Sequence, residues 1–247
     1  KYYQNNVIGS LNLIECCQET GVGLFVFSSS AAVYGNPAKI PVNENALTHP
    51  INPYGRTKLI TEWTLKDFAA RTGPDTGLRY VALRYFNVAG ASLDGALGQA
   101  TPEATHLIKV ACETACGKRD AISVFGTDYD TKDGTCIRDY IHVEDLAAAH
   151  LSALEHLAAG GDSSILNCGY GHGYSVREVL EMVRQVSGKH FEIREAGRRA
   201  GDSACLVSDN RAIREQLGWK PQYDDLEIIC STAFQWERAG RERALRI

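Results

Sequence analysis

The stretch GLFVFSSS, residues 23–30, decides the fold. Its apolar run at 24–27 has no polar interruption, which is typical of a parallel strand buried on both faces of a sheet. The serines Ser28, Ser29 and Ser30 follow at the carboxyl end of that strand. Doubly wound sheets bind their ligands at the carboxyl ends of their strands, so the sequence predicts a site beside these serines.

Helical and strand-like segments alternate around this strand. A 3.6-residue period of apolar side chains predicts a helix over 5–20, and the later segments predict a helix over 53–72 and a strand over 79–87. This order indicates a doubly wound parallel sheet of the Rossmann-like α/β class. Further along we expect helices at 103–116, 143–158, 175–187, 209–217 and 225–239, strands at 121–125, 164–168 and 190–194, and a polar loop at 126–138.

The composition argues against several classes of function. The chain has 247 residues and a net charge of -4, so it has no general attraction to nucleic acid or to an anionic membrane. No apolar run approaches the roughly 20 residues that span a bilayer, and no opening segment has the pattern of a signal peptide. The eight cysteines include no Cys-x-x-Cys pair, which favours reduced, buried thiols over zinc or disulfides. We therefore expect a cytoplasmic protein without a metal and without nucleic-acid or membrane partners.

The beginning of the chain is unusual. It opens KYYQNNVIGS, already in a helical pattern, and its only methionine is Met182. It has no G-x-G-x-x-G fingerprint, and GYGHG at 169–173 has the wrong spacing and is more typical of a turn. We therefore expect that an amino-terminal part, with the first strand and its glycine loop, is missing.

The stretch NPYGRTK, residues 52–58, carries the candidate chemistry. Asn52 can cap a helix and Pro53 suits its first position, so Tyr54 and Lys58 fall in the first turns on one face. A tyrosine has a pKa of about 10 and is a poor base at neutral pH. We expect the Lys58 charge and the positive helix end to lower the pKa of Tyr54 and make it a usable base.

Another side of this helix carries its predicted packing surface. Leu59, Trp63 and Ala70 cluster there by the helical repeat, and we expect them to bury against the sheet. Tyr54 is then presented beside Lys58, outside the core. Asn87 ends the next predicted strand, so we expect it on the same rim as the serines.

Together these residues identify a resemblance. The chain resembles the UDP-glucose 4-epimerase family of extended short-chain dehydrogenases/reductases over essentially its whole length. The segments that carry it are SSSAAVYG (28–35), PYGRTK (53–58), RYFNVAGA (84–91), THLI (105–108), GTDYDTKDGTCIRDYIHVEDLAAAH (126–150) and GWKP (218–221). The resemblance implies a partial NAD-binding Rossmann domain over 1–88 and a smaller α/β UDP-sugar-binding domain over 89–247, with parts of 139–175 packing back on the Rossmann sheet.

The resemblance also implies a reaction, which is reversible NAD-dependent 4-epimerisation of UDP-glucose and UDP-galactose through a transient 4-keto sugar. By this resemblance Tyr54 is the base, Lys58 activates it and holds the nicotinamide ribose, and Ser30 bonds the sugar's 4-hydroxyl. Asn5, Ser28 and Tyr85 match contacts to NAD. The residues that match contacts to the UDP-sugar are Asn87, His106, Leu107, Ser123, Val124, Phe125, Arg138, Arg199, Asp202 and Leu206. Among these, the arginines match the diphosphate, Asp202 the ribose, and Leu206 a position that limits space beside carbon 2 of the sugar.

Several alternatives stay open. Dehydratases of this superfamily place Asp-Glu after the serine, whereas this chain has Ala31 and Ala32, which argues against elimination. A UDP-xylose/UDP-arabinose 4-epimerase shares nearly every motif, as do other nucleotide-sugar-modifying relatives. A non-catalytic NAD-binding scaffold would usually lose Tyr54 or Lys58. The resemblance further implies a homodimer, and without a glycine loop we expect the chain alone to be inactive and to hold NAD poorly.

Overall fold

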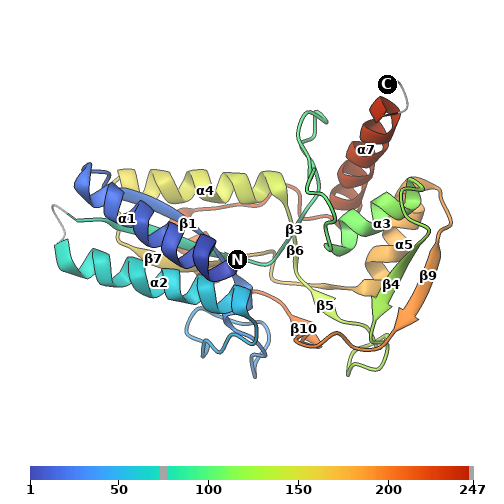
Figure 1. The fold of residues 1–247 in the computed structure, drawn as a ribbon, viewed down its shortest axis with the longest axis horizontal. Coiled ribbons are helices and arrows are strands. Elements are labelled where there is room, and N and C mark those ends of the chain that lie inside the picture. The colour runs from blue at the N-terminus through green and yellow to red at the C-terminus, as the bar shows by residue number, and fades with distance from the viewer. Residues whose placement is uncertain (73–76, 245–247) are drawn as a thin grey trace. The chain divides into compact units, whose positions relative to one another are not determined.

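The computed structural model describes residues 1–72 and 77–244 (Figure 1). The chain divides into two compact units. The first unit comprises Lys1–Phe86, Ala147–Gly171 and Ser208–Lys220, and the second comprises Asn87–Leu146, His172–Val207 and Pro221–Ile247.

A parallel sheet forms the centre of the first unit. It contains β1 (Leu24–Ser30), β2 (Arg79–Tyr85) and β7 (Ser164–Cys168), in the order β1-β2-β7. The register pairs Ser30 with Tyr85, so the carboxyl ends of β1 and β2 are level. The α/β fold with a parallel sheet, predicted from GLFVFSSS, is confirmed.

Helices accompany this sheet. They are the π-helix η1 (Tyr3–Ile8), α1 (Gly9–Glu19), the short 3₁₀ helix η2 (Ala31–Val33), α2 (Pro53–Thr72), α4 (Val143–Ala158) and α6 (Arg211–Leu217). The prediction for 53–72 is confirmed, and the helix predicted over 5–20 is divided into a π-helical and an α-helical part. In Figure 1, α2 and α4 lie on opposite sides of the strands β1 and β7.

The apolar core of this unit lies between the sheet and the first two α-helices. Ile14 of α1 and Leu65 of α2 pack with side chains of β1 and β2, such as Phe27 and Tyr80. The expectation for the packing side of α2 is wrong in two of its three residues. Leu59 is buried, but Trp63 is 57% exposed and Ala70 is also exposed.

This difference arises because α2 turns another side toward the sheet than its apolar residues indicate. The buried side of the helix centres on Thr57, Thr61, Glu62 and Leu65, three of which are polar. A pattern search for apolar side chains therefore selects the wrong side of this helix, because its buried stripe contains hydrogen-bonding groups.

The second unit contains three small sheets. Parallel pairs join β3 (Asn87–Ala89) to β6 (Tyr140–His142) and β4 (Ala121–Phe125) to β9 (Glu192–Ala196), and a third sheet has the order β10 (Cys205–Leu206), β5 (Ile137–Arg138), β8 (Tyr174–Ser175). Its helices are α3 (Leu107–Ala115), α5 (Val176–Ser187) and α7 (Leu226–Ala244).

The predicted bounds differ most at three places along the chain. The helix expected from 103 begins at Leu107, the helix expected to end at 239 continues to Ala244, and in the first unit the strand expected over 79–87 ends at Tyr85. Asn87 instead begins β3, which belongs to the second unit. Asn87 therefore follows the carboxyl end of β2 by two residues and does not end that strand itself.

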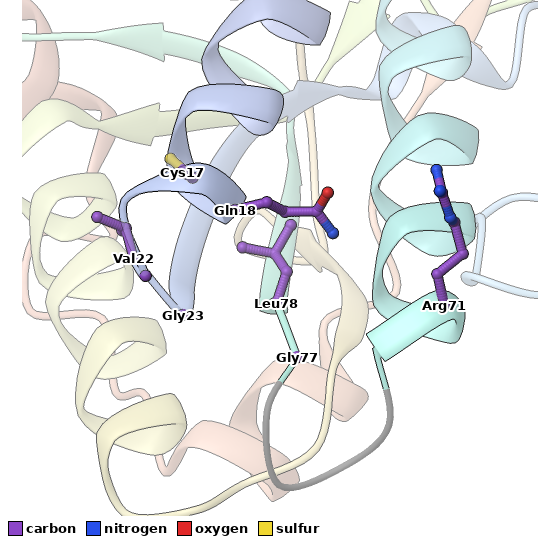
Figure 2. A pocket seen from close by; sticks show the side chains of 8 residues that line it. Cys17, Gln18, Val22, Gly23, Arg71, Gly77 and Leu78 are labelled. Carbon is purple, nitrogen blue, oxygen red and sulfur yellow. The ribbon is translucent and has the colours of Figure 1, made fainter.

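The described residues contain no membrane-spanning helix, and they form a pocket in the first unit. Within 1–72 and 77–244, no helix is long and apolar enough to cross a membrane. A pocket of about 340 Å³ opens near Cys17, Gly23 and Leu78 (Figure 2). It lies at the amino ends of β1 and β2, opposite the serines, so it is not the site predicted at the carboxyl ends.

Candidate active site

The first turn of α2 is fixed by its cap and by close packing. The side-chain oxygen of Asn52 accepts a hydrogen bond from the backbone N–H of Gly55 at 2.8 Å, which confirms the predicted cap. A Cβ at Gly55 would lie 2.4 Å from the carbonyl oxygen of Ala32. Only glycine therefore lets the helix start approach η2 so closely, and this approach places Tyr54 beside Ser30.

Tyr54 lies in a partly buried position against Ser30. A hydrogen bond joins their side chains, and the Ser30 oxygen also accepts the backbone N–H of Ala32 at 3.2 Å. Burial raises the pKa of Tyr54, and the neighbouring Tyr85 raises it further, whereas the Ser30 hydrogen bond lowers it. The expectation of a lowered pKa is therefore wrong for this arrangement, because the loss of hydration outweighs the favourable contacts.

Lys58 lies one turn further along α2. Its Nζ donates a hydrogen bond to the backbone oxygen of Ser28 at 2.8 Å and lies 5.7 Å from the centre of the Tyr54 ring. The Phe27 ring of β1 also contacts Lys58, with its ring centre 5.0 Å from Nζ. Burial lowers the pKa of Lys58. The structure thus brings Lys58 to both the Tyr54 ring and the serine strand.

Ser28 has partners from two further elements. Its Oγ lies 2.9 Å from Nε2 of His150 on α4, and a hydrogen bond joins its side chain to that of Tyr85 at the end of β2. Burial raises the pKa of Tyr85. Side chains alternate between the faces of a strand, so Ser28 faces α4 while Ser29 faces α2.

A buried polar network lies directly behind these residues, and the sequence analysis missed it. Glu62 of α2 accepts two hydrogen bonds from Arg84 of β2, at 2.9 and 2.6 Å, and one from Ser29 at 2.5 Å. Arg84 also donates to the Tyr34 hydroxyl at 2.9 Å, which donates in turn to Asn167 of β7 at 2.7 Å. All five residues are at least nine-tenths buried.

The charges in this network compensate one another. Burial alone would lower the pKa of Arg84, but its hydrogen bonds to Glu62 and its contact with Tyr34 hold it above its ordinary value. Burial raises the pKa of Tyr34 to about 12. A sequence signal did exist, because an arginine inside a buried strand needs a buried acidic partner, and Glu62 follows Tyr54 and Lys58 on the same helical face.

In the second unit the structure brings several predicted substrate residues together. Asp202 accepts two hydrogen bonds from the guanidinium of Arg199, both at 3.1 Å, and lies 3.7 Å from the guanidinium of Arg138. The Arg199 guanidinium lies 5.6 Å from the Phe125 ring centre, and Leu206 pairs with Arg138 in the β10–β5 ladder. These five residues form what we call the arginine cluster.

The other substrate residues predicted in this unit include Ser123 and Val124 on β4 and His106 before α3. On β4, Val124 is buried while Ser123 and Phe125 are exposed, so the Val124 side chain faces the interior. His106 precedes the first turn of α3, which begins at Leu107, and its Nδ1 lies 2.9 Å from the Gln99 side chain.

The remaining two predicted contacts are Asn87 and Asn5. The backbone N–H of Asn87 donates a hydrogen bond to the backbone oxygen of Asp139 at 3.0 Å. Asn5 is exposed on η1, whereas its neighbour Asn6 donates from its side chain to Thr57 of α2 at 3.0 Å.

Comparisons with known proteins identify the family of the chain. Residues 1–169 match the NAD dependent epimerase/dehydratase family. The UDP-glucose 4-epimerase of Azospirillum brasilense is 56% identical over 96% of this chain and 67% of its own length. The structure of UDP-glucose 4-epimerase from Brucella ovis in complex with NAD aligns with a TM-score of 0.91 at 46% identity, covering 96% of this chain and 72% of that one.

A third relative is the UDP-Glc/GlcNAc 4-epimerase of Campylobacter jejuni. Its structure is 54% identical with a TM-score of 0.80, and the match covers 97% of this chain and 71% of that one. Each of these relatives is aligned over nearly the whole of this chain. The chain therefore belongs to the NAD dependent epimerase/dehydratase family, whose cofactor is NAD, and within the extended short-chain dehydrogenases/reductases it groups with the UDP-glucose 4-epimerases.

Proposed function

We propose that this protein interconverts UDP-glucose and UDP-galactose by oxidation and re-reduction at carbon 4 of the sugar. The observation that carries the proposal is the contact between Tyr54 and Ser30 at the carboxyl end of β1, with Lys58 anchored beside both. This arrangement supplies a base, a hydroxyl that can relay a proton, and a positive charge within one turn of helix.

The chain's own residues would move the proton and hold the reactants. Tyr54 takes the proton of the 4-hydroxyl, directly or through Ser30, and returns it in the second half of the cycle. When bound, NAD would supply the hydride acceptor and donor and, in its oxidised form, a positive charge. Lys58, Tyr85 and Ser28 present an ammonium and two hydroxyl groups at the strand ends, a donor set that fits the ribose and nicotinamide, and Asn5 is the fourth proposed contact.

The raised pKa of Tyr54 makes the positive charges necessary. A phenol that burial keeps protonated becomes a base at neutral pH only if its anion is stabilised. The Lys58 ammonium can supply such a charge, since its Nζ lies 5.7 Å from the centre of the Tyr54 ring. We therefore assign Lys58 to stabilising the Tyr54 phenolate as well as to binding the cofactor.

The arginine cluster supports binding of the UDP part of the substrate. Arg138 and Arg199 are assigned to the diphosphate, because a guanidinium can bond two phosphate oxygens at once. Asp202 now holds both arginines and is assigned to the ribose, while the exposed ring of Phe125 is assigned to the uracil base. Asn87, His106, Leu107, Ser123 and Val124 complete the proposed substrate contacts, Val124 through its backbone.

The alternative substrates are a UDP-pentose pair, UDP-xylose and UDP-arabinose, since 4-epimerisation of these sugars uses the same proton chemistry. Elimination is disfavoured, because the residues after Ser30 are the methyl side chains Ala31 and Ala32, which cannot donate or accept a proton.

Three further statements belong to the proposal. We assign the enzyme to the cytoplasm, since its cysteines are thiols. We also assign it to a homodimer, since η1, α1 and α2 expose apolar surface at Tyr3, Ile8, Leu13 and Trp63.

We also infer that the 247 residues alone bind NAD poorly, because they contain no G-x-G-x-x-G loop. Sedimentation measures the dimer, and NAD released on denaturation measures cofactor content; a monomer, or one NAD per 247-residue chain, would contradict these points.

One coupled assay tests the main proposal. The intact parent enzyme, loaded with NAD, is given UDP-galactose together with UDP-glucose dehydrogenase, which forms NADH only when UDP-glucose appears. We expect steady NADH formation that depends on the enzyme concentration. Conversion of UDP-xylose but not of UDP-galactose would transfer the assignment to the pentose alternative, and no conversion of either would contradict epimerisation.

A further inference from the structure

His150 is a polar side chain beneath the proposed site that the catalytic proposal does not use. It lies on α4, is half-buried, and its Nε2 lies 2.9 Å from Oγ of Ser28. The residue thus links α4 to the carboxyl end of β1, two residues before the proposed catalytic serine, Ser30.

Ser28 is the point where several functional contacts meet. Its backbone oxygen accepts the hydrogen bond of Lys58 at 2.8 Å, and its side chain bonds Tyr85 as well as His150. A serine hydroxyl has one donor and two acceptor positions, so two side-chain partners fix its rotamer. Whichever tautomer the imidazole adopts, the hydroxyl can satisfy both neighbours by donating to one and accepting from the other.

We propose that His150 is a positioning residue for the epimerase, acting through Ser28. Nε2 holds the Ser28 side chain, and Ser28 in turn holds Tyr85 by its hydroxyl and Lys58 by its carbonyl oxygen. Because Lys58 and Tyr85 are assigned to the cofactor, release of Ser28 loosens the nicotinamide end of the site and the base beside it. The inference rests on the proposed function of these two residues.

The opposite face of β1 is held by other residues, so His150 acts only on the face that carries Ser28. Ser29 is held by the buried Glu62–Arg84 pair, which secures the strand against α2. His150 is instead half-buried and carries one of the contacts on the α4 face. Its removal should therefore affect the orientation of Ser28 much more than the stability of the unit.

A matched pair of substitutions tests the contact atom. His150→Gln places an amide near the position of Nε2, whereas His150→Asn is one methylene shorter and reaches only the position of Nδ1. The control is His156→Asn on the same helix, where Nε2 lies 3.1 Å from the backbone oxygen of Asp162, away from β1. Each variant is made in the intact parent enzyme and is measured for kcat and KM with UDP-galactose, for the Kd of NAD, and for Tm.

We expect His150→Asn to lower kcat and to raise the Kd of NAD, each about tenfold, which is the size of one lost hydrogen bond. His150→Gln should retain most of both properties, the two variants should share one Tm, and His156→Asn should match the unmodified enzyme. In a Ser28→Ala background, His150→Asn should cause no further loss, because its route of action is already removed.

The opposing outcomes are distinct. Equal NAD affinity and equal kcat in the Gln and Asn variants would overturn the inference, as would an undiminished effect of His150→Asn in the Ser28→Ala background. A loss that follows a lowered Tm in both variants would make His150 purely structural. If the unmodified enzyme does not epimerise UDP-galactose, the proposed function fails, while the NAD affinities still decide the role of His150.

Discussion

The two regions assigned to catalysis and to substrate binding are built in opposite ways. Behind Tyr54 and Lys58, the Glu62–Arg84 pair is almost fully buried, and each polar group in the surrounding network bonds a partner on another strand or helix. In the arginine cluster of the second unit, the Arg199 side chain is 56% exposed and Phe125 is 44% exposed. There a single carboxylate, Asp202, pairs with both arginines.

This difference matches the tasks of the two regions. Proton and hydride transfer need atoms held to fractions of an ångström, and a buried, fully bonded network gives that rigidity. Binding a diphosphate needs donors that can leave one partner for another, and Asp202 is an exchangeable partner for both guanidinium groups. Changes in the first region should therefore affect kcat or folding, whereas changes in the second should affect KM.

The largest effect is expected from Tyr54→Phe, which removes the base and keeps the ring. Loss of a general base typically costs ~10²–10⁴-fold, so we expect kcat to fall by this factor while NAD remains bound. The coupled assay and the NAD content of the purified protein measure the two properties. Tyr3→Phe on η1 is the control: it also removes one phenol hydroxyl but keeps the apolar ring at the proposed dimer surface, so it should retain full activity. A Tyr54→Phe enzyme within twofold of the unmodified one would show that another group is the base.

The next effect concerns stability and tests the buried network. Glu62→Gln removes the charge that compensates Arg84, and loss of one partner from a buried pair typically costs about 3–5 kcal/mol of the free energy of unfolding. Glu192→Gln breaks the exposed pair with Arg194, in which both side chains are more than half exposed, and should leave stability unchanged.

Urea titration measures both variants of this comparison. A lower midpoint with an unchanged slope reports a loss of stability within a two-state transition. If Glu62→Gln and Glu192→Gln unfold at the same urea concentration, the buried pair does not contribute as its burial indicates.

The fold and the site differ in how far the sequence predicts them. The strand at 24–27 and the helix over 53–72 follow from apolar periodicity and from the Asn52-Pro53 cap, since both are local signals. The partners of Glu62 and His150 depend instead on which face of β1 each helix covers, and no local pattern contains that information. The rise in the pKa of Tyr54 has the same origin, because it comes from burial in the fold and from the neighbouring Tyr85 and Tyr2, which are distant in sequence.

The third prediction tests the exchangeable character of the arginine cluster. Arg199→Lys keeps the charge but loses the planar fork that bonds two oxygens. Charge-assisted hydrogen bonds contribute about 1.5–3 kcal/mol, and a lysine keeps part of this, so we expect KM for UDP-galactose to rise about tenfold with little change in kcat. Arg194→Lys on β9, paired with Glu192, is the control and should change neither. A fall in kcat at constant KM would place Arg199 in the chemical step and contradict the contrast between the two regions.

The smallest effect concerns the choice of sugar at Leu206. This residue is half-buried in β10 and pairs in the ladder with Arg138, so it belongs to the arginine cluster but has no polar role of its own. We propose that its side chain limits space beside carbon 2, and we expect the enzyme to prefer UDP-galactose and UDP-glucose, with weak activity on UDP-N-acetylglucosamine.

Leu206→Ala should raise kcat/KM for UDP-N-acetylglucosamine relative to UDP-galactose. One side chain's worth of space shifts discrimination by about 1–3 kcal/mol, and at a half-buried position we expect the lower end of that range. The neighbouring Val207→Ala is the control, because Val207 is buried and its truncation should lower both activities together through stability. If Leu206→Ala behaves as Val207→Ala does, with an unchanged ratio of the two kcat/KM values, Leu206 is packing alone. A changed ratio at unchanged Tm would instead extend the contrast between the two regions to specificity, with the first unit setting the chemistry and the second selecting the sugar nucleotide.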